Sequence, residues 1–319
     1  MIIKKLLTRT IIFILCLISF KVLSEEIEFS STDINLENEG KVIKAFNSKA
    51  KIPSKKIEIK SNKAEYVKKN KILVLENNVI FKDNLKDIII ESDKIKYEYK
   101  KDLIFSKGNT EIRIKNNYLI ESNEIFYDRK KSKIFGDGKT IIKDGEKNVY
   151  ELNDKFSFDI TKEIIKSKKS IITDQNGNKY EFEDLVINMK INEIIGKEIK
   201  VDFINSYFGN QNNDPILKGR GGYSNKKELK LYKAIFSTCN IKNKKCRGWE
   251  LTSDEFKHNK TKKLFEYKNS WLKIFEKKIF YLPYFNHPDP TVKRKSGFLT
   301  PSYTASDSLG TSIILPYFK

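Results

Sequence analysis

The chain has 319 residues, of which 39% are hydrophobic and 12% aromatic, so it holds enough apolar material for a packed core and is not disordered throughout. Its length predicts two or three domains. The formal net charge of +20 suits a polyanionic partner, such as nucleic acid or a phosphorylated lipid, although a genome bias toward Lys, Asn and Ile codons explains much of it.

The N-terminus predicts a secretory signal peptide. Three basic residues precede an apolar run over residues 10–20, and Ser24 lies at the expected cleavage point. The run is shorter than the ~20 apolar residues that span a bilayer. We therefore expect a signal peptide over residues 1–24, with a retained N-terminal anchor as the alternative. Export of the mature chain argues against nucleic acid as its partner.

A sequence repeat with a period of about 30 residues starts near residue 57. An aromatic residue holds the sixth position of four of its five copies, which begin at Ser61, Ser92, Ser122, Asn153 and Glu183. Regular spacing of this kind predicts stacked copies of one supersecondary unit. No segment over residues 57–205 carries a helical apolar stripe with caps, and turn signals rich in Asn, Asp and Gly recur, so each unit is expected to consist of β-strands.

Apolar and polar residues alternate with a period of two in these segments, which is typical of half-buried strands. The inward faces of the stacked units would line one continuous apolar trough. Two interpretations stay open: a closed core, as in most β-sandwiches, or an open groove that holds acyl chains. By alternation alone, the candidate lipid-binding residues are Ile95, Tyr97, Ile112, Ile114, Ile125, Tyr127, Phe156 and Phe158. An error of one residue in the register would turn all of them outward.

Beyond the signal peptide the chain keeps two cysteines, Cys239 and Cys246. An exported protein favours disulfides. Zinc is disfavoured because the only histidines, His258 and His287, have spacings that match no common zinc motif. We therefore expect a Cys239–Cys246 disulfide and no metal site, with pairing to a residue beyond this chain as the alternative.

The sequence changes character near its C-terminus. Residues 261–285 predict two aromatic strands, and in the first of them Phe265, Tyr267, Asn269 and Trp271 share one face. The stretch "YLPYFNHPDPTVKRKSGFLTPSY" then covers residues 281–303, and its central His-Pro-Asp-Pro segment predicts a stiff turn because each proline fixes φ. This stretch contains four of the seven prolines of the chain, namely Pro283, Pro288, Pro290 and Pro301.

Two parts of the sequence resemble proteins that transport lipopolysaccharide. The units "SDKIKYE" at Ser92 and "SNEIFYD" at Ser122 are similar to the repeat of the OstA-like periplasmic transport proteins. The "STC" and "WEL" segments, the block at residues 281–303 and the final "ILPYF" resemble the outer-membrane LPS-assembly family known as LptD, OstA or Imp. The resemblance covers nearly the whole mature chain, and its C-terminal part is the more specific.

The resemblance implies a β-jelly roll, a folded-over sheet whose apolar interior carries lipid acyl chains, followed by the first strands of an outer-membrane β-barrel. In that family, lipid is thought to leave sideways between the first and last barrel strands. Proline removes a donor from the β-ladder, so Pro283, Pro288, Pro290 and Pro301 are candidate residues of this lateral gate or junction. The implied partners are lipopolysaccharide, a periplasmic bridge protein of the same fold (LptA-like) and an outer-membrane lipoprotein plug (LptE-like).

The sequence thus predicts an all-β chain with a signal peptide (1–24), a lead-in segment (25–56), a periplasmic jelly roll (57–250) and a junction with the first barrel strands (251–319). Too few strands follow residue 285 to close a barrel, so we expect the N-terminal part of a longer protein. The predicted function is lipopolysaccharide transport and assembly at the outer membrane, without cofactor or catalysis, because no nucleophile elbow, P-loop or metal motif occurs. The alternative is a secreted structural or adhesive β-solenoid.

Overall fold

The computed structural model describes residues 27–115, 117–203, 216–237, 248–288, 292, 297–298, 302–306 and 310–318. The predictions for the signal peptide, for Cys239 and Cys246, and for Pro290 and Pro301 lie outside these residues. The described chain is almost entirely β-strand, with one short 3-10 helix, η1 (Pro53–Lys55), which confirms the all-β prediction. Within these ranges, no helix has the length and apolar character needed to cross a membrane.

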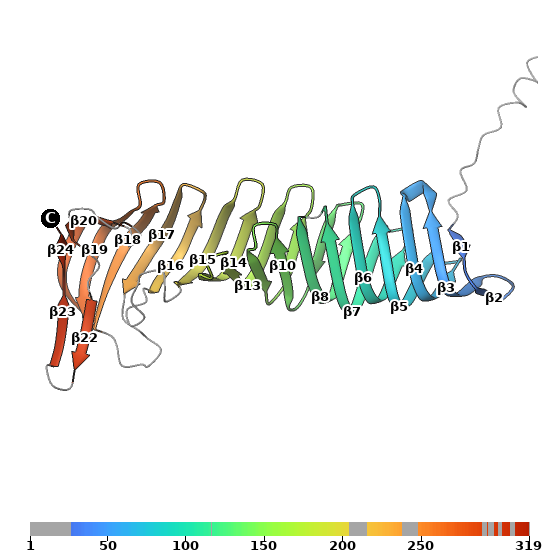
Figure 1. The fold of residues 1–319 in the computed structure, drawn as a ribbon, viewed down its shortest axis with the longest axis horizontal. Coiled ribbons are helices and arrows are strands. Elements are labelled where there is room, and N and C mark those ends of the chain that lie inside the picture. The colour runs from blue at the N-terminus through green and yellow to red at the C-terminus, as the bar shows by residue number, and fades with distance from the viewer. Residues whose placement is uncertain are drawn as a thin grey trace, which may run out of the picture.

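One antiparallel sheet of 20 strands dominates the fold. Its strands stand side by side along the long axis of the molecule, from β1 at one end to β20 at the other (Figure 1). At the C-terminal end lie two small sheets, which pair β21 (Gly297–Phe298) with β24 (Tyr317–Phe318) and β22 (Ser302–Ser306) with β23 (Gly310–Ile314). The strands of the main sheet are β1 (Glu28–Ser30), β2 (Asp33–Glu37), β3 (Val42–Ile52), β4 (Ile57–Val67), β5 (Ile72–Asp83), β6 (Ile88–Glu98), β7 (Leu103–Ile114), β8 (Tyr118–Asp128), β9 (Lys133–Gly136), β10 (Thr140–Asp144), β11 (Val149–Leu152), β12 (Phe156–Asp159), β13 (Ile164–Thr173), β14 (Lys179–Asn188), β15 (Glu193–Asp202), β16 (Ile216–Ser224), β17 (Glu228–Ser237), β18 (Trp249–Asn259), β19 (Leu264–Ile274) and β20 (Lys277–Pro288).

The long strands bend near their middle, and the bend changes which side chains face inward. Buried residues are two apart along each half of a strand but three apart across the bend, as with Phe265, Tyr267 and Ser270 of β19. Asn269 lies at this bend with a left-handed backbone, at a φ of 50°, and the ladder to both neighbouring strands skips it. The predicted shared face of Phe265, Tyr267, Asn269 and Trp271 is therefore wrong beyond Tyr267, because Ser270 takes the next inward position.

The bends fold the sheet over until the two ends of its strands meet. The turns at residues 53–56 and 99–102 lie at opposite ends of the strands, which a flat strand of this length would hold roughly 35 Å apart. Lys55 Nζ nevertheless lies 3.2 Å from Asp102 Oδ1. The sheet is thus a trough with an apolar interior and two facing rims, which fits the predicted β-jelly roll.

We name these rims the first lip and the second lip. The first lip is the row of turns that includes residues 53–56, 84–87, 145–148 and 174–178. The second lip is the row that includes residues 99–102, 129–132, 160–163, 189–192, 225–227 and 260–263.

The sequence repeat corresponds to one bent hairpin of this trough. Backbone bonds join successive turns of the second lip, from Arg129 N to Asp102 O at 3.1 Å and from Ile160 N to Ser132 O at 2.9 Å. The aromatic position of the repeat comes just before these turns, and its side chain is buried at Tyr97, Tyr127 and Phe158 and half-buried at Tyr66. The period of the repeat is therefore the length of chain that returns to the same lip.

The main sheet extends beyond both ends of the predicted jelly roll. Strand β3 pairs with β4 over its whole length, and β18, β19 and β20 continue the sheet as far as Pro288. The predicted turn over residues 287–290 is described only in its first half, because Asp289 and Pro290 lie outside the described residues, and His287 and Pro288 are in a strand. They are the last two residues of β20, where they pair with Phe265 and Leu264. The domain boundaries at residues 56 and 250 stay predictions.

Substitutions of Glu198 test whether the left-handed backbone at the bends affects stability. This exposed residue lies at the bend of β15 with a φ of 47°. Left-handed backbone costs an L-residue about 1–2 kcal/mol, and it suits β-branched side chains least. We expect Glu198→Val to lower the free energy of unfolding by about 1 kcal/mol, whereas Glu198→Gly leaves it unchanged or raises it. Urea denaturation of both variants measures this, and equal effects would contradict the backbone explanation.

Candidate functional site

The interior of the trough is filled with side chains over its first section, from β3 to β13. All eight candidate lipid-binding residues lie in this section and face inward, with exposed fractions between 0 and 4%. Aromatic rings interlock here, with Phe81 against Tyr97 at a centroid distance of 5.8 Å and Tyr118 against Phe158 at 5.4 Å. The alternation thus predicted their orientation correctly. The closed-core interpretation describes this section, and contact of these residues with lipid stays a prediction.

A buried polar cluster joins the two lips over the first section. The guanidinium of Arg129, on the second lip, donates from Nε to Asp83 Oδ2 at 2.7 Å and from Nη2 to Asp83 Oδ1 at 3.2 Å. Asp83 ends β5 beside the first lip, and both residues are at most 5% exposed. Arg129 also donates to Asp102 Oδ2 at 3.0 Å and to the carbonyl of Lys55 at 2.7 Å. We name Lys55, Asp83, Lys86, Asp102 and Arg129 the lip cluster.

Further hydrogen bonds cross between the lips on the same section. Lys86, on the first lip, donates to Ser132 Oγ at 2.6 Å and to the carbonyl of Arg129, both on the second lip. The Tyr118 hydroxyl, next to the first lip, donates to Glu163 Oε2 on the second lip at 3.0 Å. The lips are therefore fastened at several points between residues 55 and 163.

The surroundings of the lip cluster favour the charged forms of Asp102 and Arg129. Burial pushes the pKa of Asp102 up, but the hydrogen bond from Tyr97 and the charges of Arg129 and Lys55 outweigh it, so this pKa lies below its ordinary value of 3.8. Burial likewise lowers the pKa of Arg129, while bonding to Asp83 and the charges of both aspartates raise it, with a net rise. Burial and the bond to Asp102 raise the pKa of Tyr97, so its phenol remains a donor.

A cavity of about 560 Å³ opens between the lips in the second section of the trough, which runs from β13 to β18, and its lining reaches back to Tyr150 of β11. Phe182, Ile187 and Ile199 form part of its apolar floor. Met189 and Ile194 also line it and are only half-buried, unlike the eight candidate residues of the first section. The inside of the trough is thus accessible here, as the open-groove interpretation expects.

Two glycines in the wall of this cavity, Gly196 and Gly222, lie where a larger side chain would not fit. A Cβ at Gly196 would come within 2.4 Å of the Phe182 ring, and one at Gly222 would come within 2.4 Å of the backbone oxygen of Lys230. Both glycines line the cavity. Larger residues at these positions would force the walls to move.

The charged residues that border the cavity differ in sign between the two lips. Lys226, Lys260 and Lys263 border it on the second lip, and Lys260 Nζ donates to two uncharged acceptors of the neighbouring turn, at 2.7 and 3.0 Å. The first lip contributes Glu146 and Asp174. The arrangement places an apolar floor beside a basic rim, which suits an amphiphile with an anionic head group.

A second apolar cavity, of about 460 Å³, lies at the C-terminal end of the trough. Phe236, Trp249 and Tyr267 line it together with His287. The buried His287 donates from Nδ1 to the carbonyl of Pro288 at 2.8 Å, which leaves Nε2 for the Tyr267 hydroxyl at 2.9 Å. Within the described ranges, the buried Trp249 Nε1 has no hydrogen-bond partner. His287 thus packs in the trough wall, with hydrogen bonds to Tyr267 and to the carbonyl of Pro288.

The described prolines of the predicted gate lie in β20. Pro283 is exposed and stands opposite Asn269, where the ladder to β19 skips a pair, so it removes no ladder hydrogen bond. Pro288 is buried at the end of the strand. Their part in a lateral gate stays a prediction.

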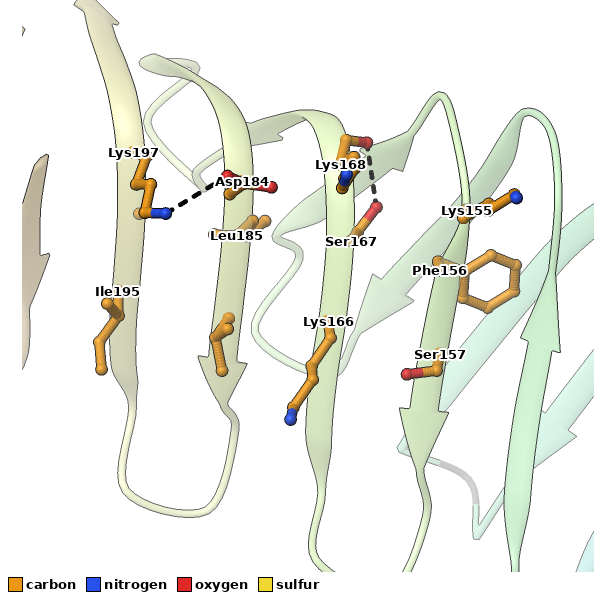
Figure 2. A pocket seen from close by; sticks show the side chains of 12 residues that line it. Lys155, Phe156, Ser157, Lys166, Ser167, Lys168, Asp184, Leu185, Ile195 and Lys197 are labelled. Carbon is orange, nitrogen blue, oxygen red and sulfur yellow. Dashed lines mark hydrogen bonds and ion pairs between the residues drawn. The ribbon is translucent and has the colours of Figure 1, made fainter. Parts of the chain in front are cut away.

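A further hollow of about 520 Å³ lies on the outer wall at the bends of β12 to β15. Figure 2 shows Lys155, Lys166 and Lys197 reaching away from the strands, with Lys197 paired to Asp184 at 3.8 Å. Its lining is mostly polar or exposed, with Ile195 on the outer face. The hollow therefore lies on the outer wall, and Gly196 is shared between its lining and that of the cavity between the lips.

Sequence reasoning missed the lip cluster and the basic rim. One feature of the sequence could have indicated the role of Arg129. Arginine is rare in this lysine-rich chain, and its planar guanidinium suits bidentate pairing with a carboxylate. Its partner Asp83 is 46 positions away, and no local pattern joins the two.

The sequence matches known proteins over part of its length. Residues 19–135 match the family described as lipopolysaccharide-assembly, LptC-related. The chain is 32% identical over 136 residues to the LPS-assembly protein LptD of Pseudoalteromonas translucida, an alignment of 40% of this chain and 18% of that relative. It is 35% identical over 90 residues to LptD of Shewanella sp. strain MR-4, which covers 28% of this chain and 11% of the relative. The aligned regions thus span less than a fifth of these relatives.

The folded-over sheet and the family match over residues 19–135 together make the chain similar to OstA-like β-jelly-roll proteins. Over the aligned residues the chain is also similar to LptD proteins, and this similarity covers only part of it.

Proposed function

We propose that this chain takes part in lipopolysaccharide transport, with acyl chains held inside the trough and the anionic head group at the second lip. The observation that carries the proposal is the cavity between the lips, whose floor is apolar and whose rim holds three lysines. Its volume of about 560 Å³ lies within the range of sites that bury small-molecule ligands. The similarity to lipopolysaccharide-assembly proteins supports the same role.

The proposed setting is the periplasm and the outer membrane. The trough would receive lipopolysaccharide from a periplasmic bridge protein of the same fold (LptA-like) and pass it to a barrel, with a plug lipoprotein (LptE-like) as a further partner. Exposed aromatic residues on β20, including Phe280, Tyr281 and Tyr284, support continuation of the sheet toward an apolar environment. No catalytic step is proposed, because transport along an apolar surface breaks no bond.

Photo-crosslinking from two neighbouring positions tests the proposal. Ile194 lies half-buried in the cavity, whereas Ile195 is 56% exposed on the outer face of the same strand. A photoreactive residue at position 194 is expected to form an adduct with purified lipopolysaccharide, and the same residue at position 195 is not. A structural or adhesive solenoid without lipid transport would give no difference between the two positions.

The basic rim leads to a prediction about affinity. The double variant Lys226→Glu/Lys263→Glu places two negative charges beside the anionic head group, so the adduct yield at position 194 is expected to fall several-fold, most strongly at low salt. The matched control is Lys49→Glu/Lys60→Glu, which makes the same change of charge at exposed, paired positions of β3 and β4. Equal losses in both variants would mean that overall charge, not the rim, sets the yield.

A further inference from the structure

We propose that the lip cluster is a latch, which fastens the two lips over the first section so that acyl chains pass through this section only while the latch is open. This inference rests on the proposed function. In this proposal the buried ion pairs of Arg129 control the access of lipid to the trough, in addition to stabilising the core.

The bonds of the cluster bridge elements that only the folding of the sheet brings together. Arg129 and Asp102 belong to the second lip, while Asp83 and Lys55 belong to strand ends at the first lip. Beneath them the core residues are almost completely buried. An acyl chain that enters this section must therefore part the lips and displace the side chains that fill the trough.

A polar fastening is suited to repeated opening. Parting an apolar seam exposes apolar surface to water, which is unfavourable in proportion to its area. Parting a buried ion pair returns both charges to water, and this hydration offsets much of the lost attraction. The Arg129–Asp83 pair has two parallel bonds, so the closed state also has a defined geometry.

Because of where the latch lies, lipid has two different routes into the trough. The cross-lip bonds named above extend to Tyr118 on the first lip and Glu163 on the second, and the cavity lining begins beyond each of them, at Glu146 on the first lip and Met189 on the second. Lipid can therefore bind from the side in the second section without opening the latch. Movement along the first section, from the N-terminal edge of the sheet, requires the latch to open.

The test uses the full chain and weakens the latch gently. Asp102→Asn removes one charge of the cluster. Lys86→Met/Tyr118→Phe removes two cross-lip hydrogen bonds of the cluster and the neighbouring one from Tyr118, without leaving a buried carboxylate unpaired. The control is Lys130→Met, because Lys130 Nζ bonds the carbonyl of Lys100 along the same lip and not across.

Two measurements decide the result. Without lipid, hydrogen exchange of β6 and β8 amides is expected to accelerate by about tenfold in the latch variants and not in the control. With purified lipopolysaccharide, adducts from a photoreactive residue at position 112 are expected to rise several-fold in the latch variants, while those at position 194 stay constant.

The latch proposal would be wrong if hydrogen exchange of the β6 and β8 amides were unchanged in both latch variants. It would also be wrong if this exchange accelerated equally in Lys130→Met. An equal yield at position 112 in wild type and latch variants would overturn control of passage, even if the lips open. Loss of adducts at position 194 in every form, wild type included, would instead refute the proposed function, and hydrogen exchange would still decide whether the lips are fastened.

Discussion

The Arg129→Leu variant is expected to lose about 3–5 kcal/mol of the free energy of unfolding at neutral pH, because breaking a buried ion pair leaves the remaining charge uncompensated. The Asp83 side chain is 0% exposed, and the Arg129 guanidinium supplies the two charged hydrogen bonds among those that Asp83 accepts, the others coming from the Tyr127 hydroxyl and from backbone N–H groups. Asp102 loses a bond at the same time. Urea denaturation of the full chain measures the effect.

Arg113→Leu provides the control for this loss. Arg113 bonds Glu91 at 2.7 Å on the outer wall, and the two side chains are 45% and 43% exposed. Exposed pairs contribute at most about 1 kcal/mol, so a loss as large as that of Arg129→Leu would show that burial is not the cause.

The pH dependence of the Arg129→Leu effect has a definite sign. The pKa of Asp102 is lowered in the folded state, so its contribution to stability is complete above its ordinary pKa of 3.8 and is lost as the pH falls through the lower folded value. Removing Arg129 raises this folded pKa. The difference in stability between wild type and variant should therefore shrink on acidification below about pH 4.

Phe158→Ala is expected to lower the free energy of unfolding by about 3–5 kcal/mol, since truncating a buried aromatic leaves a cavity as well as losing apolar contact. Phe158 is 0% exposed and packs edge to face against Tyr118. Thermal or urea unfolding measures the loss. This prediction decides whether the candidate lipid-binding residues of the first section serve as core.

Phe280→Ala is the matched control, because Phe280 is 58% exposed on β20. Substitutions of exposed residues typically change stability by at most about 0.5 kcal/mol. If Phe158→Ala lowered the free energy of unfolding as little as Phe280→Ala, the side chains of the first section would not be tightly packed. Acyl chains could then enter this section without opening of the latch.

The fold class could be predicted because its signals are local. Alternation along half a strand, as from Ile112 to Ile114, follows from the geometry of the backbone and predicted the inward faces correctly. The alternation failed across the bend of β19, where Asn269 in a left-handed conformation shifts the inward phase to Ser270. The β-propensity of single residues gives no warning of such a shift.

The sequence by itself determined that the protein is all-β, that its unit repeats at a regular spacing, and which side chains of each half-strand face inward, since these depend on neighbours along the chain. Only the tertiary structure decided that the first section is filled and fastened while the second is open. That outcome depends on how far each bend folds the sheet, which brings Asp83 to Arg129 across 46 positions and leaves a cavity beyond them.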